Sequence, residues 1–241
     1  MRSMAIEVFN RYEHKYLLSR GEYEKIICAI EPHMEPDRYN EGGKPYTIAN
    51  IYCDTPDDYL IRRSLEKPLY KEKLRLRSYG VPNKDSEVFI EIKKKFNGLV
   101  NKRRSAITLS EAYEFLASGK APEAREGMNA QVLKEIEYFV SFYRPMPKLY
   151  LAYDRIAFFE RGNSDVRISF DTAVRSRRYD LKLESGDYGA PLLADGKYLM
   201  EIKTSLAKPL WLVKILSELN IRRSAFSKYG AEFAEHCKIA I

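Results

Sequence analysis

Charged and apolar side chains alternate along two neighbouring stretches of this sequence. In the range 71–77 every second residue is Lys or Arg, and Leu74 and Leu76 stand between them. The range 88–95 repeats the alternation with Glu and Lys as its charged residues. Because successive side chains of a strand point to opposite faces, each stretch predicts a strand with one charged and one apolar face. The turn-forming residues at 81–86 predict that the two strands make an antiparallel hairpin.

The same charged alternation returns in three other parts of the chain, at 11–15, 167–171 and 201–203. A solvated sheet face is the simpler explanation of any one of these strands. However, these faces concentrate Arg and Lys, each with a Glu or Asp nearby. Several such strands predict a closed sheet with a polar lumen and with helices outside it. Such a lumen would bind a polyanion, and its acids would be available to hold a divalent cation.

The composition is that of a globular protein with an acidic partner. The chain has 241 residues, of which 45% are hydrophobic and 31% charged, and its net charge is +7. This length suffices for a full core, and with no repeat or linker it predicts a single domain over residues 1–241. The positive charge by itself does not separate nucleic acid, nucleotide, polyphosphate and membrane surface as partners.

The cysteines and the apolar segments indicate a cytoplasmic protein. Cys28, Cys53 and Cys237 are odd in number, far apart and without a CxxC pair. They are therefore expected to be reduced thiols rather than disulfides or a zinc site. The first residues are too polar for a signal peptide, and two charged residues interrupt the most apolar helical run, 210–219.

The remaining pattern predicts about eight strands interspersed with helices. A capping box at 19–22 opens the first helix. Ser110 is expected to cap a short helix that ends at Gly119. Further helices are expected over 129–143, where apolar residues recur at helical spacing, and over 225–237.

Eight short motifs resemble the catalytic domain of the vacuolar transporter chaperone (VTC) family, a branch of the triphosphate tunnel metalloenzymes. They are RYEHKY (11–16), IYCDT (51–55), LRLRSYG (74–80), FIEIK (89–93), YDR (153–155), VRISFD (166–171), MEIK (200–203) and FSKY (226–229). An RxR motif alone is common, but eight motifs in order over nearly the whole chain are fairly specific. The resemblance implies an α+β fold, namely an eight-stranded antiparallel β-barrel that forms the triphosphate tunnel, with helices packed outside.

The resemblance also implies ATP-dependent polyphosphate synthesis. The terminal phosphate of a growing chain would attack the γ-phosphorus of a nucleotide held in the tunnel, with Mn²⁺ or Mg²⁺ as the divalent metal. The residues that it assigns to gripping phosphate oxygens are Lys15, Arg75, Arg77, Lys93, Arg155, Arg167 and Lys228. It assigns metal binding to Glu201, helped by Glu13. Candidates for further nucleotide contacts are Arg11, Lys102, Arg104 and Lys203.

The physical logic of these assignments stands without the family. Phosphoryl transfer needs little covalent help, and its catalysis is mainly alignment and neutralisation of charge. Arg suits bidentate contacts to oxygen, whereas Lys acts as a compact point charge. The cation that follows the central hairpin stays open among Lys102, Arg103 and Arg104, although strand alternation favours Lys102 or Arg104.

Two departures from related motifs bear on the activity. Tunnel triphosphatases begin with ExExK, whereas the first position here is Arg11. Exchanging a metal-facing carboxylate for a cation favours phosphate grip over metal-bound hydrolysis, which favours a polymerase. Polymerases of this kind carry a further Lys three residues before Lys228, and here that residue is Ala225. The absence of this Lys bears on the strength of binding at the product side of the tunnel.

Two other functions are compatible with the same charged faces. One is a tunnel triphosphatase acting on nucleoside triphosphate or tripolyphosphate, and the other is a non-catalytic polyanion-binding module. ATP or another triphosphate and polyphosphate are the expected ligands, and nucleic acid is not expected. Any coupling to export would need a membrane-protein partner in trans. The sequence leaves open the metal and nucleotide preference, the polymer length and the oligomeric state.

Overall fold

The computed structural model describes residues 8–238, and they divide into two compact units. Unit 1 contains residues 48–151 and 176–189, together with the first described residues up to Asn10. Unit 2 contains 11–47, 152–175 and the chain from Ala190 onward. Each unit therefore combines segments that are far apart in the sequence.

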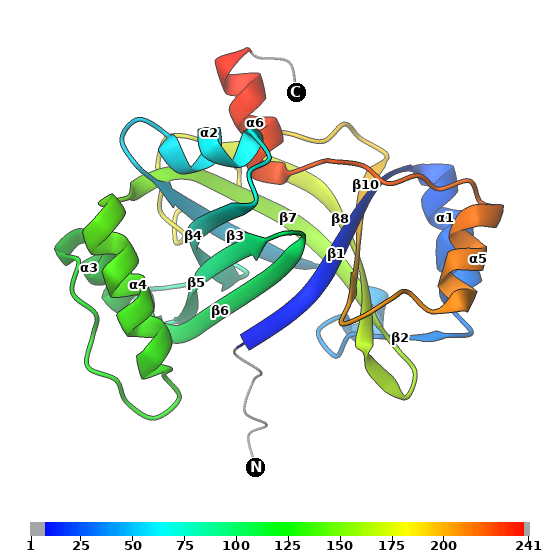
Figure 1. Cartoon of the computed structure of the whole chain (residues 1–241), viewed down its shortest axis with the longest axis horizontal. Helices are drawn as coiled ribbons and strands as arrows, with labels where there is room; N and C mark the ends of the chain where they lie inside the picture. The colour runs from blue at the N-terminus through cyan, green and yellow to red at the C-terminus, as the bar shows by residue number, and fades with distance from the viewer. Residues whose placement is uncertain (1–7, 239–241) are drawn as a thin grey trace. The chain divides into compact units, whose positions relative to one another are not determined.

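The secondary structure consists of six helices and ten strands in the described part of the chain (Figure 1). The helices are α1 (Arg20–Ile30), α2 (Tyr59–Leu65), α3 (Leu109–Ser118), α4 (Ala130–Tyr143), α5 (Leu210–Glu218) and α6 (Lys228–Cys237), with a 3-10 turn η1 (Glu41–Gly43). The strands are β1 (Val8–Ser19), β2 (Met34–Pro36), β3 (Tyr46–Asp54), β4 (Tyr70–Tyr79), β5 (Glu87–Phe96), β6 (Leu99–Thr108), β7 (Met146–Glu160), β8 (Asn163–Arg177), β9 (Ala190–Pro191) and β10 (Lys197–Thr204). Eight of these strands have eight or more residues, which agrees with the predicted number.

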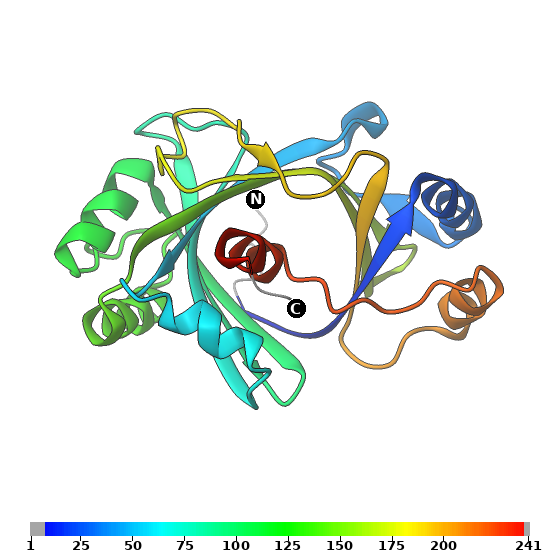
Figure 2. The ribbon, with the colours of Figure 1, turned by 90° about the horizontal axis from the view of Figure 1, so that it is seen from above.

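Unit 1 is built on the antiparallel meander β3–β4–β5–β6. The pairing of β4 with β5 confirms the predicted hairpin, and it aligns Leu74 with Ile92 and Leu76 with Ile90. This apolar face is fully buried. Helices α3 and α4 pack against β5 and β6 and lie together on one side of the unit in both ribbon views (Figures 1 and 2). The helices therefore do not cover the opposite, charged face, which is available to bind a ligand.

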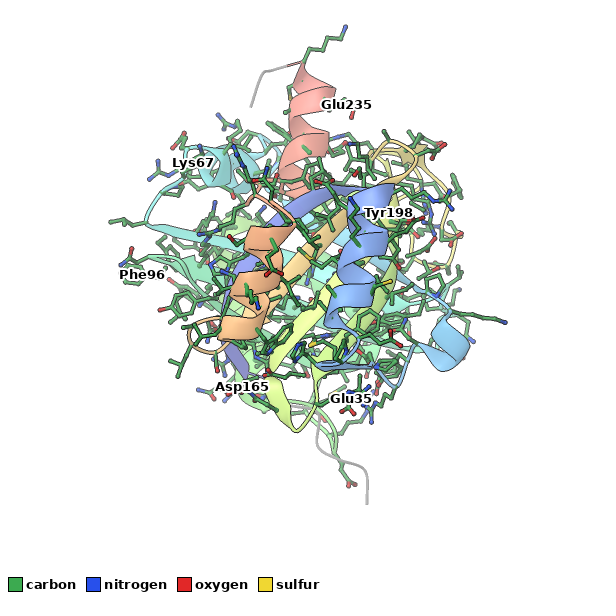
Figure 3. The ribbon with its side chains drawn as sticks, turned by 90° about the vertical axis from the view of Figure 1, so that its right-hand side faces the viewer. Glu35, Lys67, Phe96, Asp165, Tyr198 and Glu235 are labelled. Carbon is green, nitrogen blue, oxygen red and sulfur yellow. The ribbon has the colours of Figure 1, made fainter. Side chains whose placement is uncertain are left out.

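Unit 2 is built on the antiparallel order β1–β10–β8, and β7 pairs with β8. One face of these strands carries Phe170, Met200 and Ile202, which form a buried core with α1 and α5 through Ile26 and Leu212. Figure 3 looks onto this side, where α1 (blue) and α5 (orange) lie side by side. As in unit 1, helices take the apolar face of the strands and leave the charged one.

The cap of α3 differs from the prediction. The N-cap is Thr108 rather than Ser110, and its hydroxyl accepts a hydrogen bond from the backbone of Glu111. The Glu111 carboxylate in turn accepts one from the Thr108 backbone N–H at 2.9 Å. The T-x-x-E capping box at 108–111 therefore starts the helix immediately where β6 ends.

The last helix is shorter than predicted. It begins at Lys228 rather than at Ala225, with Ser227 as its N-cap. The preceding segment is held in a non-helical conformation, and the Ser224 N–H donates to the carbonyl of Lys15 at 2.7 Å. A tertiary contact with β1 thus overrides the local helical tendency of the FSKY motif.

The cysteines and the lengths of the helices bear on two further expectations from the sequence. Cys28, Cys53 and Cys237 are all free. Burial, followed by the nearby charge of Asp54, raises the pKa of the Cys53 thiol to about 12, so this thiol stays protonated. Among the described residues no helix is both long and apolar enough to cross a membrane.

Candidate functional site

In unit 1, the predicted cations of three adjacent strands share one face. We call this set the basic face, and its members are Lys73, Arg75 and Arg77 of β4, Glu91 and Lys93 of β5, and Lys102 and Arg104 of β6. The register sets Arg75, Glu91 and Arg104 in one row across the strands. It sets Lys73, Lys93 and Lys102 in the next row on the same face. Six cations and one carboxylate, that of Glu91, therefore share this face.

Glu91 is the centre of the basic face. Its side chain is fully buried, and its carboxylate lies 2.7 Å from Arg75 Nε, 2.5 Å from Lys102 Nζ and 3.8 Å from Arg77 Nε. Burial alone would raise the pKa of this carboxyl, but Arg77, Lys102 and Arg75 outweigh burial and hold the pKa well below its usual range. Glu91 is therefore ionised and fixes the cations around it.

The crowding of positive charge also acts on Lys102. Burial lowers the pKa of its ammonium, and the charge of Glu91 opposes this effect. The added repulsion from Arg77 and Arg75 leaves the pKa well below its ordinary value. A bound anion would relieve this repulsion and raise the pKa of Lys102 again.

Neutral side chains orient the two arginines of β4. Arg75 Nη1 donates to the Tyr52 hydroxyl at 3.1 Å, and Arg77 Nε donates to Asn50 Oδ1 at 3.0 Å. Asn50 is itself fixed, because its amide donates to the carbonyl of Leu151 at 3.0 Å. Both guanidinium planes are held in the way that bidentate recognition of phosphate requires.

Arg103 lies on the other face of β6. Its Nη1 is 2.5 Å from a carboxylate oxygen of Glu135 in α4, and Lys94 also pairs with Glu135. The choice that the sequence left open is thus resolved by position. Lys102 and Arg104 belong to the basic face, whereas Arg103 joins the sheet to a helix.

In unit 2, the predicted residues gather around two buried carboxylates. We call this set the acid–base cluster, and its members are Lys15, Arg155, Asp171, Glu201, Lys203 and Lys228. Strand pairing brings Lys15 opposite Glu201 and Leu199 opposite Asp171. Residues from β1, β7, β8, β10 and the first turn of α6 therefore meet at one place.

Asp171 is held by the strongest contacts of the cluster. Arg155 donates to its two oxygens at 2.6 and 2.7 Å, and Lys228 Nζ lies 2.5 Å away. Burial would raise the pKa of the Asp171 carboxyl, but Arg155 and Lys228 outweigh this and lower it. Burial would also lower the pKa of the Arg155 guanidinium, but Asp171 raises it well above its ordinary value. The fork therefore fixes Arg155 and Lys228 as permanent cations.

Glu201 lies among four cations without a single dominant partner. The four nitrogen atoms are 3.3 to 3.4 Å from its oxygens, and they belong to Lys228, Lys15, Arg155 and Lys203. Burial would raise the pKa of Glu201, but this ring of charge, with Lys228 and Lys15 foremost, holds it well below its usual range. The contacts are longer than a typical N–H···O hydrogen bond, so their attraction is mainly Coulombic.

Arg167, Arg11 and Glu13 extend the cluster along β1 and β8. Glu13 is paired with Lys203 in the β1–β10 register, and Lys203 with Arg167 in the β10–β8 register. Arg167 Nη2 donates to Asp37 at 2.8 Å and to the Tyr46 hydroxyl at 3.2 Å. Burial lowers the pKa of Arg11, and Arg167 adds to that lowering against the charge of Asp165. All eight predicted residues of unit 2 are thus linked in one series of contacts and strand pairs.

The two candidate metal ligands, Glu201 and Glu13, lie on either side of a lysine. Glu201 and Glu13 are oxygen donors of the kind that Mg²⁺ and Mn²⁺ prefer. The Lys15 ammonium lies between them, 3.4 Å from Glu201 and 3.5 Å from Glu13. No group of three or more Asp, Glu, His or Cys side chains placed to hold a metal ion occurs in the part of the chain that the structure describes. An ion bound here would take at most these two carboxylates and would complete its shell with phosphate oxygens and water.

The sequence did not identify the anchoring carboxylates as a group. Glu91 and Asp171 lie in the FIEIK and VRISFD motifs, but the sequence did not single them out as site residues. It did not single out Asn50 or Tyr52 either. The signal was present in the alternation, because Glu91 lies between the positions of Phe89 and Lys93 on the charged side of β5. Its role as a shared counter-ion depends on the strand register, which cannot be read from the sequence.

Comparison with solved structures shows the fold. A putative adenylate cyclase from Bacillus halodurans superimposes with a TM-score of 0.57, covering 92% of this chain and 96% of that chain at 14% identity. A putative adenylyl cyclase from Hippeastrum, described as having a dominant triphosphatase activity, gives a TM-score of 0.52 at 15% identity, covering 96% and 97%. These likenesses confirm the predicted class, α+β with an eight-stranded antiparallel barrel of the triphosphate tunnel type and helices outside it.

Comparison with protein families and curated proteins shows the family. The model of the VTC domain matches residues 10–236. Subunit 4 of the vacuolar transporter chaperone complex from Trypanosoma brucei brucei is 30% identical over 93% of this chain, and the subunit from Trypanosoma cruzi is 26% identical over 93%. The chain spans about a third of the length of these relatives, 34% in each. It belongs to the VTC domain family.

Proposed function

We propose that this protein is a polyphosphate polymerase-like enzyme that transfers the γ-phosphate of ATP to a growing polyphosphate chain in a basic tunnel, with the help of a divalent metal. The observation that carries the proposal is the basic face, where six cations lie on one face of three adjacent strands and three of them, Arg75, Arg77 and Lys102, contact the carboxylate of Glu91. Like charges held together in this way repel one another, and a phosphate chain would offset the repulsion. Phosphates are also the groups for which fixed Arg and Lys side chains are suited.

The acid–base cluster supplies what phosphoryl transfer requires. Arg155 and Lys228 are fixed as cations by Asp171 and would neutralise charge on the transferring group. Glu201, together with Glu13, would hold the divalent metal, which would supply further neutralisation and alignment of the phosphates. Lys15 and Lys203 flank the same carboxylate and would contact phosphate oxygens.

The three buried carboxylates are ionised, and this favours transfer to phosphate over hydrolysis. A carboxylate that activates a water molecule must accept its proton, and the pKa values of Glu91, Asp171 and Glu201 are all lowered by neighbouring cations. Carboxylates in this state accept protons poorly. The terminal phosphate of a polyphosphate chain is already an anion at neutral pH, so it can attack without a base.

The proposal extends to the cellular setting. The relatives are named as subunits of a complex and are about three times as long as this chain. This supports the proposal that a catalytic domain in the cytoplasm works with a partner in trans for any export of the polymer. Because the VTC domain model covers 10–236, we propose that residues 1–241 act as one catalytic domain.

The direct test is to incubate the pure protein with ATP and Mn²⁺, or Mg²⁺, and to resolve the products by gel electrophoresis and ³¹P NMR. The expected result is long-chain polyphosphate that forms together with ADP. ADP and orthophosphate without polymer would instead support the triphosphatase alternative, which the Hippeastrum likeness favours. Binding of ATP without any turnover and with a steep dependence on salt would support a non-catalytic polyanion-binding module.

A further inference from the structure

A second cationic pocket lies in unit 2, on the helix-covered side of the strands. It has a volume of about 260 Å³ and is formed by β1, α5 and the chain on either side of α5. Figures 1 and 3 show α5 and the segment that runs from it to α6. The polar residues that line it are Tyr16, Lys208, Ser217, Asn220 and Arg223. Because Tyr16 and Lys15 are successive residues of β1, the pocket and the acid–base cluster lie on opposite faces of this strand.

The charge of this pocket is entirely positive. Lys208 and Arg223 line it, and no Asp or Glu does. Within residues 8–238, as the structure describes them, no carboxylate lies within 4 Å of either nitrogen group. Burial lowers the pKa of Lys208, and the charge of Arg223 lowers it further, so the two cations repel each other. Lys208 is half-buried and Arg223 is exposed, so an anion in the pocket would relieve the repulsion between them.

The side chain of Tyr16 adds a neutral donor to the pocket. Tyr16 is only 2% exposed and lines the pocket, and its hydroxyl makes no hydrogen bond to another described residue. Burial raises the pKa of Tyr16 in spite of the charge of Arg223, so the hydroxyl stays protonated and available as a donor. A ligand in the pocket would provide an acceptor for this hydroxyl.

We propose that this pocket binds a phosphate-type oxyanion, orthophosphate or the end of a short phosphate chain, as a second anion site apart from the basic face and the acid–base cluster. Lys208 and Arg223 would supply the charge, and the Tyr16 hydroxyl would supply a neutral donor from the floor. Ser217 and Asn220 would complete the site with hydroxyl and amide groups. Such a mixture of cations and neutral donors satisfies the several oxygens of a phosphate.

The position of the pocket gives it a structural consequence. The chain from Arg223 continues through Ser224, whose N–H donates to the carbonyl of Lys15 at 2.7 Å, to Lys228 in the acid–base cluster. A bound anion would therefore hold the segment that positions Lys228. The site is close in the chain to the chemistry but shares none of its residues.

The test is a titration of the full chain with pyrophosphate, followed by amide NMR shifts of Ser217 and Asn220. The test variant is Lys208→Ala/Arg223→Ala. The matched control is Lys214→Ala/Lys25→Ala, which removes the same charge from exposed positions on α5 and α1 that do not line the pocket. Parallel titrations with orthophosphate and tripolyphosphate distinguish a single phosphate from the end of a chain.

The expected result is saturable movement of both amides in the wild type and in the control, with binding at least about tenfold weaker in the test variant. Shifts at the basic face, followed on Arg75 and Lys93, should be alike in all three proteins. Equal affinity in the test variant, or unmoved amides in the wild type while the basic face responds, would overturn the proposal. Urea unfolding of each variant checks that the fold is retained. Loss of polymerase activity alone would bear only on the proposed function.

Discussion

Three buried carboxylates decide how the cations of this protein are arranged. Glu91 and Asp171 are fully buried, and Glu201 is nearly so. Each of them contacts more than one cation, and each has its pKa lowered as a result. A carboxylate in such a position fixes Arg and Lys side chains without neutralising them completely. The remaining positive charge is then available to phosphate.

Glu201→Ala is expected to lower polyphosphate synthesis by about 100-fold or more, which is the usual effect of removing one electrostatic group from an active site. The matched control is Glu135→Ala, which also removes a carboxylate that pairs with two cations but lies on the helix-covered face. Both variants should lose stability, because each leaves cations without a partner. Only Glu201→Ala should lose turnover. Equal activity losses in the two variants would show that Glu201 acts through the fold alone.

Arg75→Ala is expected to weaken binding of a non-hydrolysable ATP analogue by about 1.5–3 kcal/mol, the range of a hydrogen bond to a charged group. Arg103→Ala is the control, because Arg103 also pairs closely with a glutamate but on the opposite side of the same sheet. Its effect on affinity should be small. Isothermal titration calorimetry measures both, and similar losses of affinity would contradict the placement of Arg75 in the ligand site.

At this scale the sequence predicted which residues carry the charge but not which residues pair. Arg75 with Glu91 and Arg155 with Asp171 are both sixteen residues apart in the chain. Alternation assigns each of them to a charged face, whereas the partner of each depends on the strand register. The register follows from turn length and from the packing of the apolar face, and neither is written in the spacing of the charges.

Among the elements, the starts of the helices carry local information that the sequence holds in full. The capping box of α3 is an example, because Thr108 and Glu111 form two reciprocal bonds. The Ser110 prediction failed because two residues close in sequence, Thr108 and Ser110, were eligible as caps, and the end of β6 selected the earlier one. Tertiary contact, in contrast, moved the start of α6, since the bond from Ser224 to Lys15 holds the preceding residues out of the helix.

The loop at 178–189 could not be predicted, because a single side chain shapes it. Arg177 donates to the carbonyls of Asp180, Lys182, Gly186 and Tyr188. Its guanidinium also lies over the ring of Tyr150 at 3.5 Å. A sequence pattern shows that the segment is irregular, but it does not show that one arginine satisfies four of its carbonyl groups.

The cap of α3 gives a prediction for the pH dependence of stability. The hydrogen bond from Arg125 and the bonds from Thr108 lower the pKa of Glu111 to about 2, from an ordinary value of 4.5. Because the folded pKa is depressed, the stabilisation is complete above about pH 4.5 and is lost as pH falls toward about 2. Glu111→Gln should therefore flatten the dependence of the urea midpoint on pH in this window. Glu114→Gln, an exposed change on the same helix, should leave it as in the wild type.

For the whole molecule, the net charge of +7 means that any salt will raise stability by screening repulsion. A specific ligand must do more than this. Tripolyphosphate that binds only the folded protein stabilises it by RT ln(1 + [L]/Kd), which is about 4 kcal/mol at a thousand times Kd. The unfolding temperature should thus rise with tripolyphosphate well beyond the rise produced by NaCl of the same ionic strength.

The comparison at equal ionic strength distinguishes specific binding of tripolyphosphate from general screening of the positive charge. Screening depends on ionic strength alone, so a purely diffuse positive surface would give the same unfolding curve with either salt. A site of fixed cations responds to the valence and shape of the ligand, so tripolyphosphate should act at far lower concentration than sulfate. Arg75→Ala/Arg77→Ala should remove most of this excess while the response to NaCl persists. Coincident curves for the wild type in tripolyphosphate and NaCl would mean that the basic face does not act as a phosphate site, and the polymerase proposal would lose its physical basis.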